Sequence, residues 1–243
     1  MNYAIIAAGE GSRLAAEGLH TPKPLVKVGG ECLVDRLIRI FICQGAQSIA
    51  VLCNERDMEV QRHLRVLSDM GLDGQALPLR FRAKNTPSSM HSLHQLRPLI
   101  GDGPFCLTTV DTVFREKEFA LYMEYFLSAI AKGECQGVMG VTDFVDDEKP
   151  LYVGVDDDGD ITGFYDDSHG CRFVSAGIYG LSPEIWKVLE RCVNRGERRM
   201  RNFQRALIDE GLHLKAFTFS KVMDIDHVAD VALADQWLED NHG

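Results

Sequence analysis

Short apolar runs alternate with longer amphipathic segments along the first part of the chain. Five runs have the length and composition of buried strands and cover residues 3–8, 48–53, 79–83, 105–110 and 137–142. Between them, apolar residues recur at helical spacing, as they do in residues 31–44 and 119–130. Strands that alternate with helices of this length predict an α/β fold with a parallel, doubly wound sheet.

The pattern changes after the fifth run. Residues 143–167 are rich in acids, and two short runs within them, separated by an acidic turn, predict a β-hairpin. An apolar run at 173–181 and an alternating run at 214–219 predict two further strands, the second at a sheet edge. The pattern therefore predicts a single domain, 1–243, with a distinct sub-region at about 143–221.

The first predicted strand ends in a turn that contains two glycines. Gly9 and Gly11 flank Glu10, and glycines let backbone N–H groups turn toward a ligand. Arg13 and Lys23 add two cations beside that turn, and prolines on both sides of Lys23 restrict its backbone. Bare amides with cations at the carboxyl end of a strand suit a polyphosphate.

Two other glycine-loop classes and an ordinary turn are the alternatives for this segment. A dinucleotide fingerprint needs a third glycine, where this chain has Leu14. A P-loop needs Gly-Lys-Ser/Thr, but Lys23 is followed by Pro24. A plain glycine turn with exposed basic residues is the competing interpretation. Polyphosphate binding is favoured because two glycines and two cations stand together.

The N-terminal residues read Ala7-Ala8-Gly9-Glu10-Gly11-Ser12-Arg13-Leu14 and then Pro22-Lys23-Pro24-Leu25. This order resembles the signature of the nucleotidyltransferases that make nucleotide-diphospho-sugars. Members join a nucleoside triphosphate to a sugar 1-phosphate or to phosphocholine and release pyrophosphate. The resemblance implies a Rossmann-like three-layer α/β/α sandwich with a mostly parallel mixed sheet. It also implies nucleotide binding by Ala8, Gly9, Glu10, Gly11, Ser12 and Arg13, and catalytic roles for Arg13 and Lys23.

The loop after the third predicted strand holds Thr86, Ser88 and Ser89. Ser88 or Ser89 can cap the helix that follows, and this structural role is one interpretation. The loop also stands at the carboxyl end of a parallel strand, where ligands collect. Its resemblance to the base-reading loop of phosphocholine cytidylyltransferase-like members implies that the three residues contact base or ribose. Residues 87–93 lack the asparagines of that form, so the base stays open.

Three aspartates stand next to predicted strands. Asp111 follows the fourth apolar run, and Asp224 and Asp226 precede the last predicted helix, where they would share one face of a strand. Turn formation or helix capping is the structural alternative. A carboxylate just past a buried strand is well placed to hold a divalent ion against phosphate. The family's metal positions match Asp111 and Asp226, with Asp224 as a partner, so the resemblance implies Mg²⁺ on these aspartates.

The strand predicted at 173–181 contains Ser175 and Gly177, and small residues permit close approach by a ligand. The segment resembles the part of the family that borders the acceptor sugar, with serine in place of asparagine. The family's Glu-Lys pair for the sugar phosphate corresponds to Asp166-Asp167, which removes a cation and favours a cationic acceptor such as choline or an amino sugar. The sub-region is thus expected to bind the acceptor through Asp167, Ser175, Gly177 and Arg199.

Five arginines stand in residues 195–205 of an acidic chain. A solvated basic start of a helix is the favoured interpretation. Binding of the acceptor phosphate by Arg198, Arg199 or Arg201 and a contact within a homodimer are the alternatives.

The composition limits which binding partners and which cellular compartment are expected. A chain of 243 residues buries enough surface to fold without a disulfide or metal. The net charge of −10 argues against general binding to nucleic acid or to a membrane surface. Seven scattered cysteines without a CxxC pair indicate reduced thiols in a cytoplasmic protein. Neither a signal peptide nor a membrane span is expected.

The favoured hypothesis is a Mg²⁺-dependent nucleotidyltransferase that moves a nucleoside monophosphate from a nucleoside triphosphate to a small phosphorylated acceptor. Lys23 would neutralise charge as the transition state forms. A glycosyltransferase of related fold is one alternative, but it needs Asp-x-Asp after a middle strand, and Asp111-Thr112-Val113 lacks the second acid. A non-catalytic nucleotide-binding protein, which would release no pyrophosphate, is the other.

Overall fold

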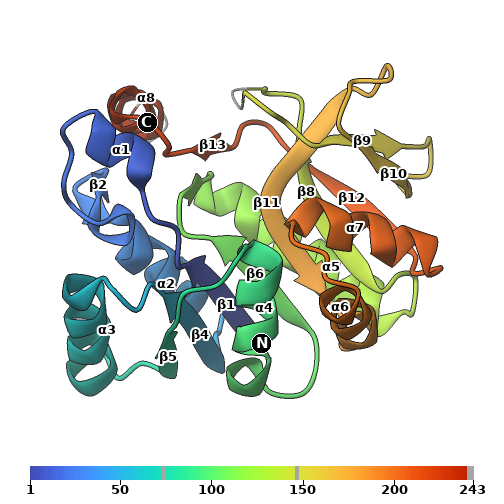
Figure 1. Ribbon diagram of the computed structural model, residues 1–243. Coiled ribbons are helices and arrows are strands. Elements are labelled where there is room, and N and C mark those ends of the chain that lie inside the picture. The colour runs from blue at the N-terminus through green and yellow to red at the C-terminus, as the bar shows by residue number, and fades with distance from the viewer. Residues whose placement is uncertain (73–74, 146–147, 240–243) are drawn as a thin grey trace.

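A nine-stranded mixed sheet forms the centre of the computed structural model, which describes all residues except 73–74, 146–147 and 240–243 (Figure 1). Its main path runs in the order β10, β9, β11, β6, β1, β4, β5, and β8 and β12 extend it from β11. The strands are β1 (Asn2–Ala7), β4 (Ser48–Cys53), β5 (Leu79–Ala83), β6 (Phe105–Thr109), β8 (Gly137–Thr142), β9 (Tyr152–Val155), β10 (Ile161–Tyr165), β11 (Phe173–Leu181) and β12 (Leu214–Phe219).

Strand direction divides the sheet into two parts. β1, β4, β5 and β6 run parallel to one another. β11 is antiparallel to β6, β8 and β9, and β12 runs parallel to β8 at the edge. The expected α/β fold with a mixed sheet is confirmed, and the antiparallel strands gather in the sub-region that begins near residue 143, of which 146–147 lie outside the described residues.

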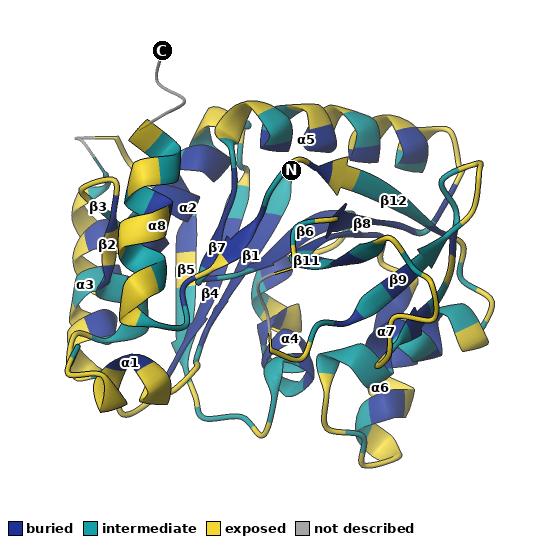
Figure 2. Ribbon diagram, turned by 90° about the horizontal axis from the view of Figure 1, so that it is seen from above, coloured by how far each residue is buried: buried dark blue, intermediate teal, exposed yellow. Residues whose placement is uncertain are grey.

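Helices cover both faces of the sheet and complete three layers (Figure 2). One face carries α2 (Leu33–Cys43), α3 (Met58–Met70), α5 (Glu116–Ala131) and α8 (Val228–Glu239), and the other carries α4 (Ser89–Ile100), α6 (Ile185–Asn194) and α7 (Met200–Asp209). The central strand β1 shows why both faces need cover. Tyr3 and Ile5 belong to one hydrophobic core, and Ala4 and Ile6 belong to the other, because successive side chains point to opposite faces.

Aromatic packing between α5 and the sheet fixes the chain that follows β6. Phe114 is fully buried and stacks on Phe119 with ring centroids 4.8 Å apart. Burial of each such ring contributes about 1.5–3 kcal/mol. α5 can lie close to β11 because Gly180 has no side chain, and a Cβ there would lie 2.7 Å from the Phe126 ring. The anchored Phe114 in turn holds the short loop that carries Asp111.

Predicted element boundaries agree with the structure to within a few residues, with one departure. The strand predicted around Asp224 and Asp226 is only β13 (Met223–Asp224), which pairs with β7 (Thr112–Val113).

All seven cysteines are free thiols. No helix in the described part of the chain combines the length and apolarity that crossing a bilayer requires.

Candidate active site

The turn after β1 lines a cavity of about 620 Å³, called the larger cavity below. Gly11 precedes α1 (Ser12–Ala16) with φ of +59°, a conformation that costs a residue with a side chain about 1–2 kcal/mol. A Cβ at Gly11 would also lie 3.4 Å from the Lys23 Cβ. All of the nucleotide-binding residues predicted in this turn line the larger cavity, namely Ala8, Gly9, Glu10, Gly11, Ser12 and Arg13.

Lys23 lies at the centre of the charged side chains of the larger cavity. Lys23 stands between Pro22 and Pro24 and begins a 3₁₀ turn (Lys23–Leu25). Its side chain is only 9% exposed. Its Nζ lies 2.6 Å from Asp111 Oδ2 and 2.7 Å from Asp226 Oδ1. Burial alone would lower the pKa of Lys23, but the two carboxylates outweigh burial and raise it above its usual value. Lys23 is therefore held as an ammonium between two carboxylates.

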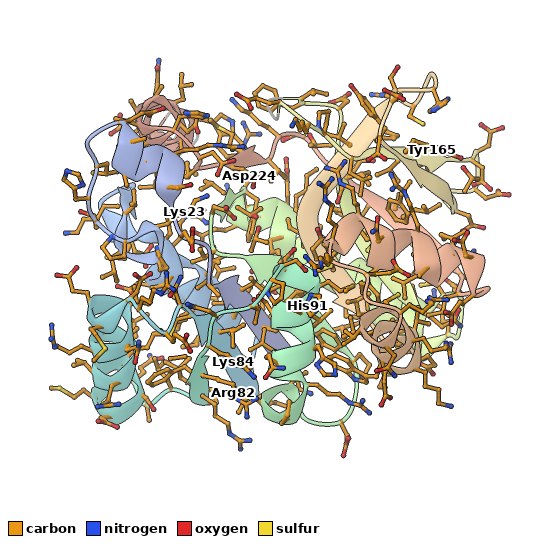
Figure 3. All side chains as sticks on the ribbon, in the orientation of Figure 1. Lys23, Arg82, Lys84, His91, Tyr165 and Asp224 are labelled. Atoms are coloured by element: carbon orange, nitrogen blue, oxygen red, sulfur yellow. The ribbon has the colours of Figure 1, made fainter. Side chains whose placement is uncertain are left out.

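Backbone pairing brings these two carboxylates together from distant parts of the chain. Asp111 directly precedes β7, and Asp226 lies two residues beyond β13. The two short strands pair antiparallel, with Thr112 opposite Asp224. The N–H of Ile225 also donates to the carbonyl of Asp111 at 3.1 Å. Figure 3 shows Lys23 and Asp224 on the same side of the sheet, where α1 and β13 approach each other.

Asp224 and Asp226 do not share one face of a strand as the sequence predicted, and their contacts differ. β13 ends at Asp224, before Asp226, and both aspartates line the smaller cavity described below. Thr112 Oγ1 donates to Asp224 Oδ1 at 3.4 Å, whereas Asp226 accepts from Lys23 and, at 2.6 Å, from Arg13. Burial raises the pKa of Asp226, but Lys23 and Arg13 outweigh it and the pKa is lowered.

A second set of contacts joins α1 to the start of α8 beside Arg13. Glu17 accepts from His227 Nδ1 at 2.5 Å and from the N–H of Val228 at 2.7 Å. Asp230, rather than Asp226, caps the start of the helix by accepting from the N–H groups of Asp226 and His227. The hydrogen bond raises the pKa of His227 and lowers that of Glu17. Sequence reasoning missed this link because its partners are 210 positions apart.

The loop between β5 and α4 forms another wall of the larger cavity. Thr86, Ser88 and Ser89 line it as predicted, together with Asn85 and Ser92. Thr86 Oγ1 donates to the Ser88 carbonyl at 3.3 Å and lies 2.7 Å from Ser92 Oγ. The predicted capping bond is not formed, because Ser88 Oγ lies 3.0 Å from the Nδ1 atom of His91 instead. The hydroxyls thus order the loop itself.

Asn54 also lines the larger cavity and was missed by the sequence reasoning. It is 5% exposed, and its amide donates to the carbonyl of Ala8 at 3.4 Å while its Oδ1 accepts from the N–H of Arg56 at 2.9 Å. Asn54 therefore braces the glycine turn from the next strand. The available signal was its place directly after a buried strand, the same signal that identified Asp111.

A second cavity of about 330 Å³, called the smaller cavity below, adjoins the larger one because Arg13 and Asp226 line both. Its polar wall includes Thr142, Glu148, Ser175, Asp224, His227 and Asp230. These side chains come from β8, from the segment between β8 and β9, from β11, and from residues 224–230, which include the first turn of α8. The shared residues place the two cavities on either side of the Arg13–Asp226 ion pair.

Only part of the predicted acceptor site reaches the smaller cavity. Ser175 lines it, and Gly177 lies two residues further along β11 with φ of +70°. A Cβ at Gly177 would lie 3.0 Å from Thr112 Oγ1, so glycine allows β11 to pack against the β7 loop. Among the described residues that line either cavity, neither Asp167 nor Arg199 occurs, and both side chains are exposed.

Asp166, the first residue of the acidic pair after β10, makes structural contacts with α7. Asp166 accepts from Arg201 at 2.5 Å and from Arg205 at 2.9 Å, and these bonds hold its pKa below the usual range. Arg201 also donates to the carbonyl of Lys149 at 3.0 Å. The preceding Tyr165 lies on the β9–β10 hairpin, across β11 from Lys23 (Figure 3). At least two arginines of the 195–205 cluster thus fasten α7 to neighbouring segments.

Ser175 is supported from behind by a buried polar contact. Gln204 of α7 is 2% exposed, and its Nε2 donates to Ser175 Oγ at 3.4 Å. Burial raises the pKa of Tyr179 to about 12, although its hydrogen bond with Ser175 favours ionisation. The Ser175 hydroxyl therefore meets two buried polar groups and lies at the wall of the smaller cavity.

Asp111 and Asp226 fit the requirements of a Mg²⁺ site. Both carboxylates reach the same point, the Nζ of Lys23, within 2.7 Å. Mg²⁺ is usually bound by one or two carboxylates plus substrate phosphates. In the part of the chain that the structure describes, no group of three or more His, Cys, Asp or Glu side chains gathers to hold a metal ion by itself. The donor set fits an ion whose coordination is completed by phosphate oxygens.

Comparisons with known proteins agree with this geometry. The model of a family described as nucleotidyl transferase matches residues 3–239. The N-acetylmuramate α-1-phosphate uridylyltransferase of Caulobacter vibrioides is 26% identical over 112 residues. That alignment covers 46% of this chain and 46% of the relative, so less than half of the relative's length is matched.

Solved structures share the fold over almost the whole chain. The inositol-1-phosphate CTP transferase of T. maritima has a TM-score of 0.78 at 20% identity, over 99% of this chain and 97% of that one. A UDP-glucose pyrophosphorylase in complex with UDP-glucose has a TM-score of 0.79 at 15% identity, over 98% of each chain. At these identities the likeness supports the fold.

Proposed function

The chain belongs to the nucleotidyl transferase family, and from that premise we propose that it transfers a nucleoside monophosphate from a nucleoside triphosphate to a phosphorylated acceptor and releases pyrophosphate. One observation carries this proposal. Two adjoining cavities share Arg13 and Asp226, and Lys23 lies against Asp226 where they meet. A transfer between two substrates needs such a junction, because the reacting phosphates must meet at one point.

The reaction would proceed by direct displacement. A phosphate oxygen of the acceptor attacks the α-phosphorus, and the bond to the β-phosphate oxygen breaks, so that pyrophosphate leaves with the electron pair. The backbone N–H groups of residues 9–12 and the Arg13 guanidinium would bind the β- and γ-phosphates. Lys23 would turn its ammonium toward the reacting phosphates and offset the charge of the transition state.

Mg²⁺ is the proposed cofactor, with Asp111 and Asp226 as its protein ligands. Bound there, the ion would offset phosphate charge near the α-phosphorus. The support is the approach of both carboxylates to a single cation. Asp224 would remain outside this pair, since its carboxylate lies against Thr112 and lines only the smaller cavity.

The acceptor would bind in the smaller cavity, against Ser175 and the segment before α8. The names of the similar proteins specify N-acetylmuramate 1-phosphate and inositol 1-phosphate, so ring-shaped polyol phosphates are the first acceptors to test. Phosphocholine is the second class to test. The seven free thiols support a reaction in the reducing cytoplasm.

The test is release of pyrophosphate by the purified full chain. Each of the four common nucleoside triphosphates is offered with each acceptor class, with Mg²⁺ or with excess EDTA. We expect one nucleotide and acceptor pair to give pyrophosphate that needs Mg²⁺. Nucleotide binding without pyrophosphate from any pair would contradict the proposal and favour a non-catalytic binding protein. Turnover of a nucleotide-sugar donor in its place would favour a glycosyltransferase.

A further inference from the structure

Lys23 makes the same two contacts that a divalent cation would make at the proposed metal site. Its ammonium lies 2.6 Å from Asp111 Oδ2 and 2.7 Å from Asp226 Oδ1. The other oxygen of Asp226, Oδ2, accepts from Arg13 at 2.6 Å. Both oxygens of Asp226 are therefore engaged by protein cations, and one oxygen of Asp111 is engaged as well.

To bind both carboxylates, a free divalent cation has to displace at least one of the contacts of Asp226. Hydrogen bonds between an ammonium and a carboxylate are among the strong ones, and the Lys23 side chain is only 9% exposed. An ion that arrives without phosphate offers Lys23 no new acceptor. It would leave a buried ammonium beside a second cation, which is unfavourable because burial strengthens the repulsion.

A polyphosphate removes that penalty, because its oxygens can accept from the displaced ammonium. The backbone of Lys23 is restricted by the prolines on both sides, so the side chain has to make the exchange. The phosphate-binding turn is close by, since a Cβ at Gly11 would lie 3.4 Å from the Lys23 Cβ. Short side-chain rotations would carry the ammonium from the carboxylates toward this turn.

We propose that Lys23 competes with divalent cations for Asp111 and Asp226, so that the metal binds weakly by itself and enters the site together with the nucleotide phosphates. The second half of this statement rests on the proposed function. The competition itself depends only on the contacts of the protein. Lys23 is then both a phosphate-binding residue and the group that keeps the metal site selective for a metal–nucleotide complex.

The experiment measures binding of Mn²⁺, a spectroscopic substitute for Mg²⁺, to metal-free full-length protein by electron paramagnetic resonance. Lys23→Met removes the charge and keeps an unbranched side chain that is only one heavy atom shorter. Lys23→Gln also removes the charge but keeps an N–H donor toward the carboxylates, in case Lys23→Met does not fold. Lys27→Met is the matched control, because Lys27 is an exposed residue of the nearby strand β2 (Lys27–Val28).

We expect both Lys23 variants to bind Mn²⁺ at least about tenfold more tightly than wild type, and Lys27→Met to bind as wild type does. Asp111→Asn in the Lys23→Gln background should abolish the gain in Mn²⁺ affinity, because that gain depends on the carboxylate that Lys23 no longer engages. Circular dichroism checks that each variant is folded. Folded Lys23 variants with wild-type affinity for Mn²⁺ would overturn the proposal, as would a gain that survives Asp111→Asn.

Pyrophosphate release by the wild type separates this inference from the proposed function. If the wild type releases none but the Lys23 variants bind Mn²⁺ more tightly, the competition stands and the proposed function fails. If the wild type is active and the variants show no gain, the competition alone fails.

Discussion

The two cavities of this protein are built in different ways. The larger cavity lies at the carboxyl ends of the parallel strands β1, β4, β5 and β6, and one continuous stretch, residues 6–14, supplies much of its lining. The smaller cavity is lined by β8, by the antiparallel strand β11 and by segments near residues 144–150 and 222–230. The proposed phosphate-binding wall is thus built largely from one local stretch of the chain, whereas the proposed acceptor cavity depends on tertiary contacts.

The cavities also differ in how their charges are matched. In the larger cavity, Lys23 and Arg13 face Asp111 and Asp226 at hydrogen-bonding distance, and Glu10 is a third carboxylate of the lining. The smaller cavity has a larger excess of carboxylates, since Glu148, Asp224 and Asp230 join Asp226 there against Arg13 and His227. Substitutions of residues that line both cavities should therefore impair the use of both substrates. Substitutions of residues that line one cavity should impair the use of one substrate.

The largest effect is expected from Asp226→Asn, compared with the same change two residues earlier. Asp226 binds Lys23 and Arg13 and lines both cavities, so its loss should lower kcat by roughly 10²–10³-fold. Asp224→Asn should raise only the KM for the acceptor, by about 3- to 10-fold, because Asp224 lines only the smaller cavity. Steady-state pyrophosphate release with each substrate varied measures both values.

Equal losses of kcat in the two variants would contradict these separate roles of Asp226 and Asp224. The two aspartates would then act as one functional pair. Thermal unfolding serves as the control. Both variants should unfold within a few degrees of the wild type, since neither side chain is part of a hydrophobic core.

Removal of one hydroxyl from each cavity should have a smaller effect, but it should distinguish the two cavities more clearly. Thr86→Val removes the bonds that order the loop of the larger cavity, so the KM for the nucleotide should rise about tenfold. Ser175→Ala should raise the KM for the acceptor by a similar factor. It also leaves the buried Gln204 amide without this partner, at a cost of about 1–3 kcal/mol of unfolding free energy.

The measurements are the two KM values and the melting temperature, which falls by about 2–4 °C per kcal/mol for a chain of this size. An increase in the nucleotide KM of Ser175→Ala as large as that in the acceptor KM would show that the cavities do not bind separate substrates. A wild-type melting temperature for Ser175→Ala would remove Gln204 as a support of this wall.

The same contrast explains how much the sequence could predict. The layers, most strands and the glycine turn were predicted correctly, because each depends on the residues next to it. Asp111, which lines the larger cavity, was singled out by its position after a buried strand together with the family resemblance, and Asn54 has the same position after a strand. What the sequence could not give is the partner of a side chain on a distant segment, as with Glu17 and His227.

Asp167 and Arg199 illustrate this limit in the smaller cavity. Asp167 stands where the family has its Glu-Lys pair, and Arg199 was a candidate for the cation missing there, but spacing along the chain does not fix where a loop points. In the structure, Asp166 is engaged by Arg201 and Arg205, and this contact holds the loop against α7. An acidic run and a basic run 30–40 residues apart can neutralise each other, and only the fold decides whether they do.

The smallest expected effect concerns pH and the link between the two cavities. Glu17 and His227 join α1, next to the larger cavity, to the start of α8, next to the smaller one. The hydrogen bond raises the pKa of His227 above 6.5, so its contribution to stability is full below that pH and is lost as pH rises through the raised value. The pKa of Glu17 is lowered below 4.5, so its contribution is lost only in acid.

The pair should therefore stabilise the protein at about pH 6 and no longer do so at about pH 9. His227→Asn should lower the melting temperature at the lower pH, on the order of 1 °C, and hardly at all at the higher pH. The effect is small because both side chains are 39% exposed and solvent screens the pair. His20→Asn is the control, since His20 makes no ion pair among the described residues. A loss of the same size at both pH values would show that His227 acts by packing, and the charge link between the cavities would then have to be abandoned.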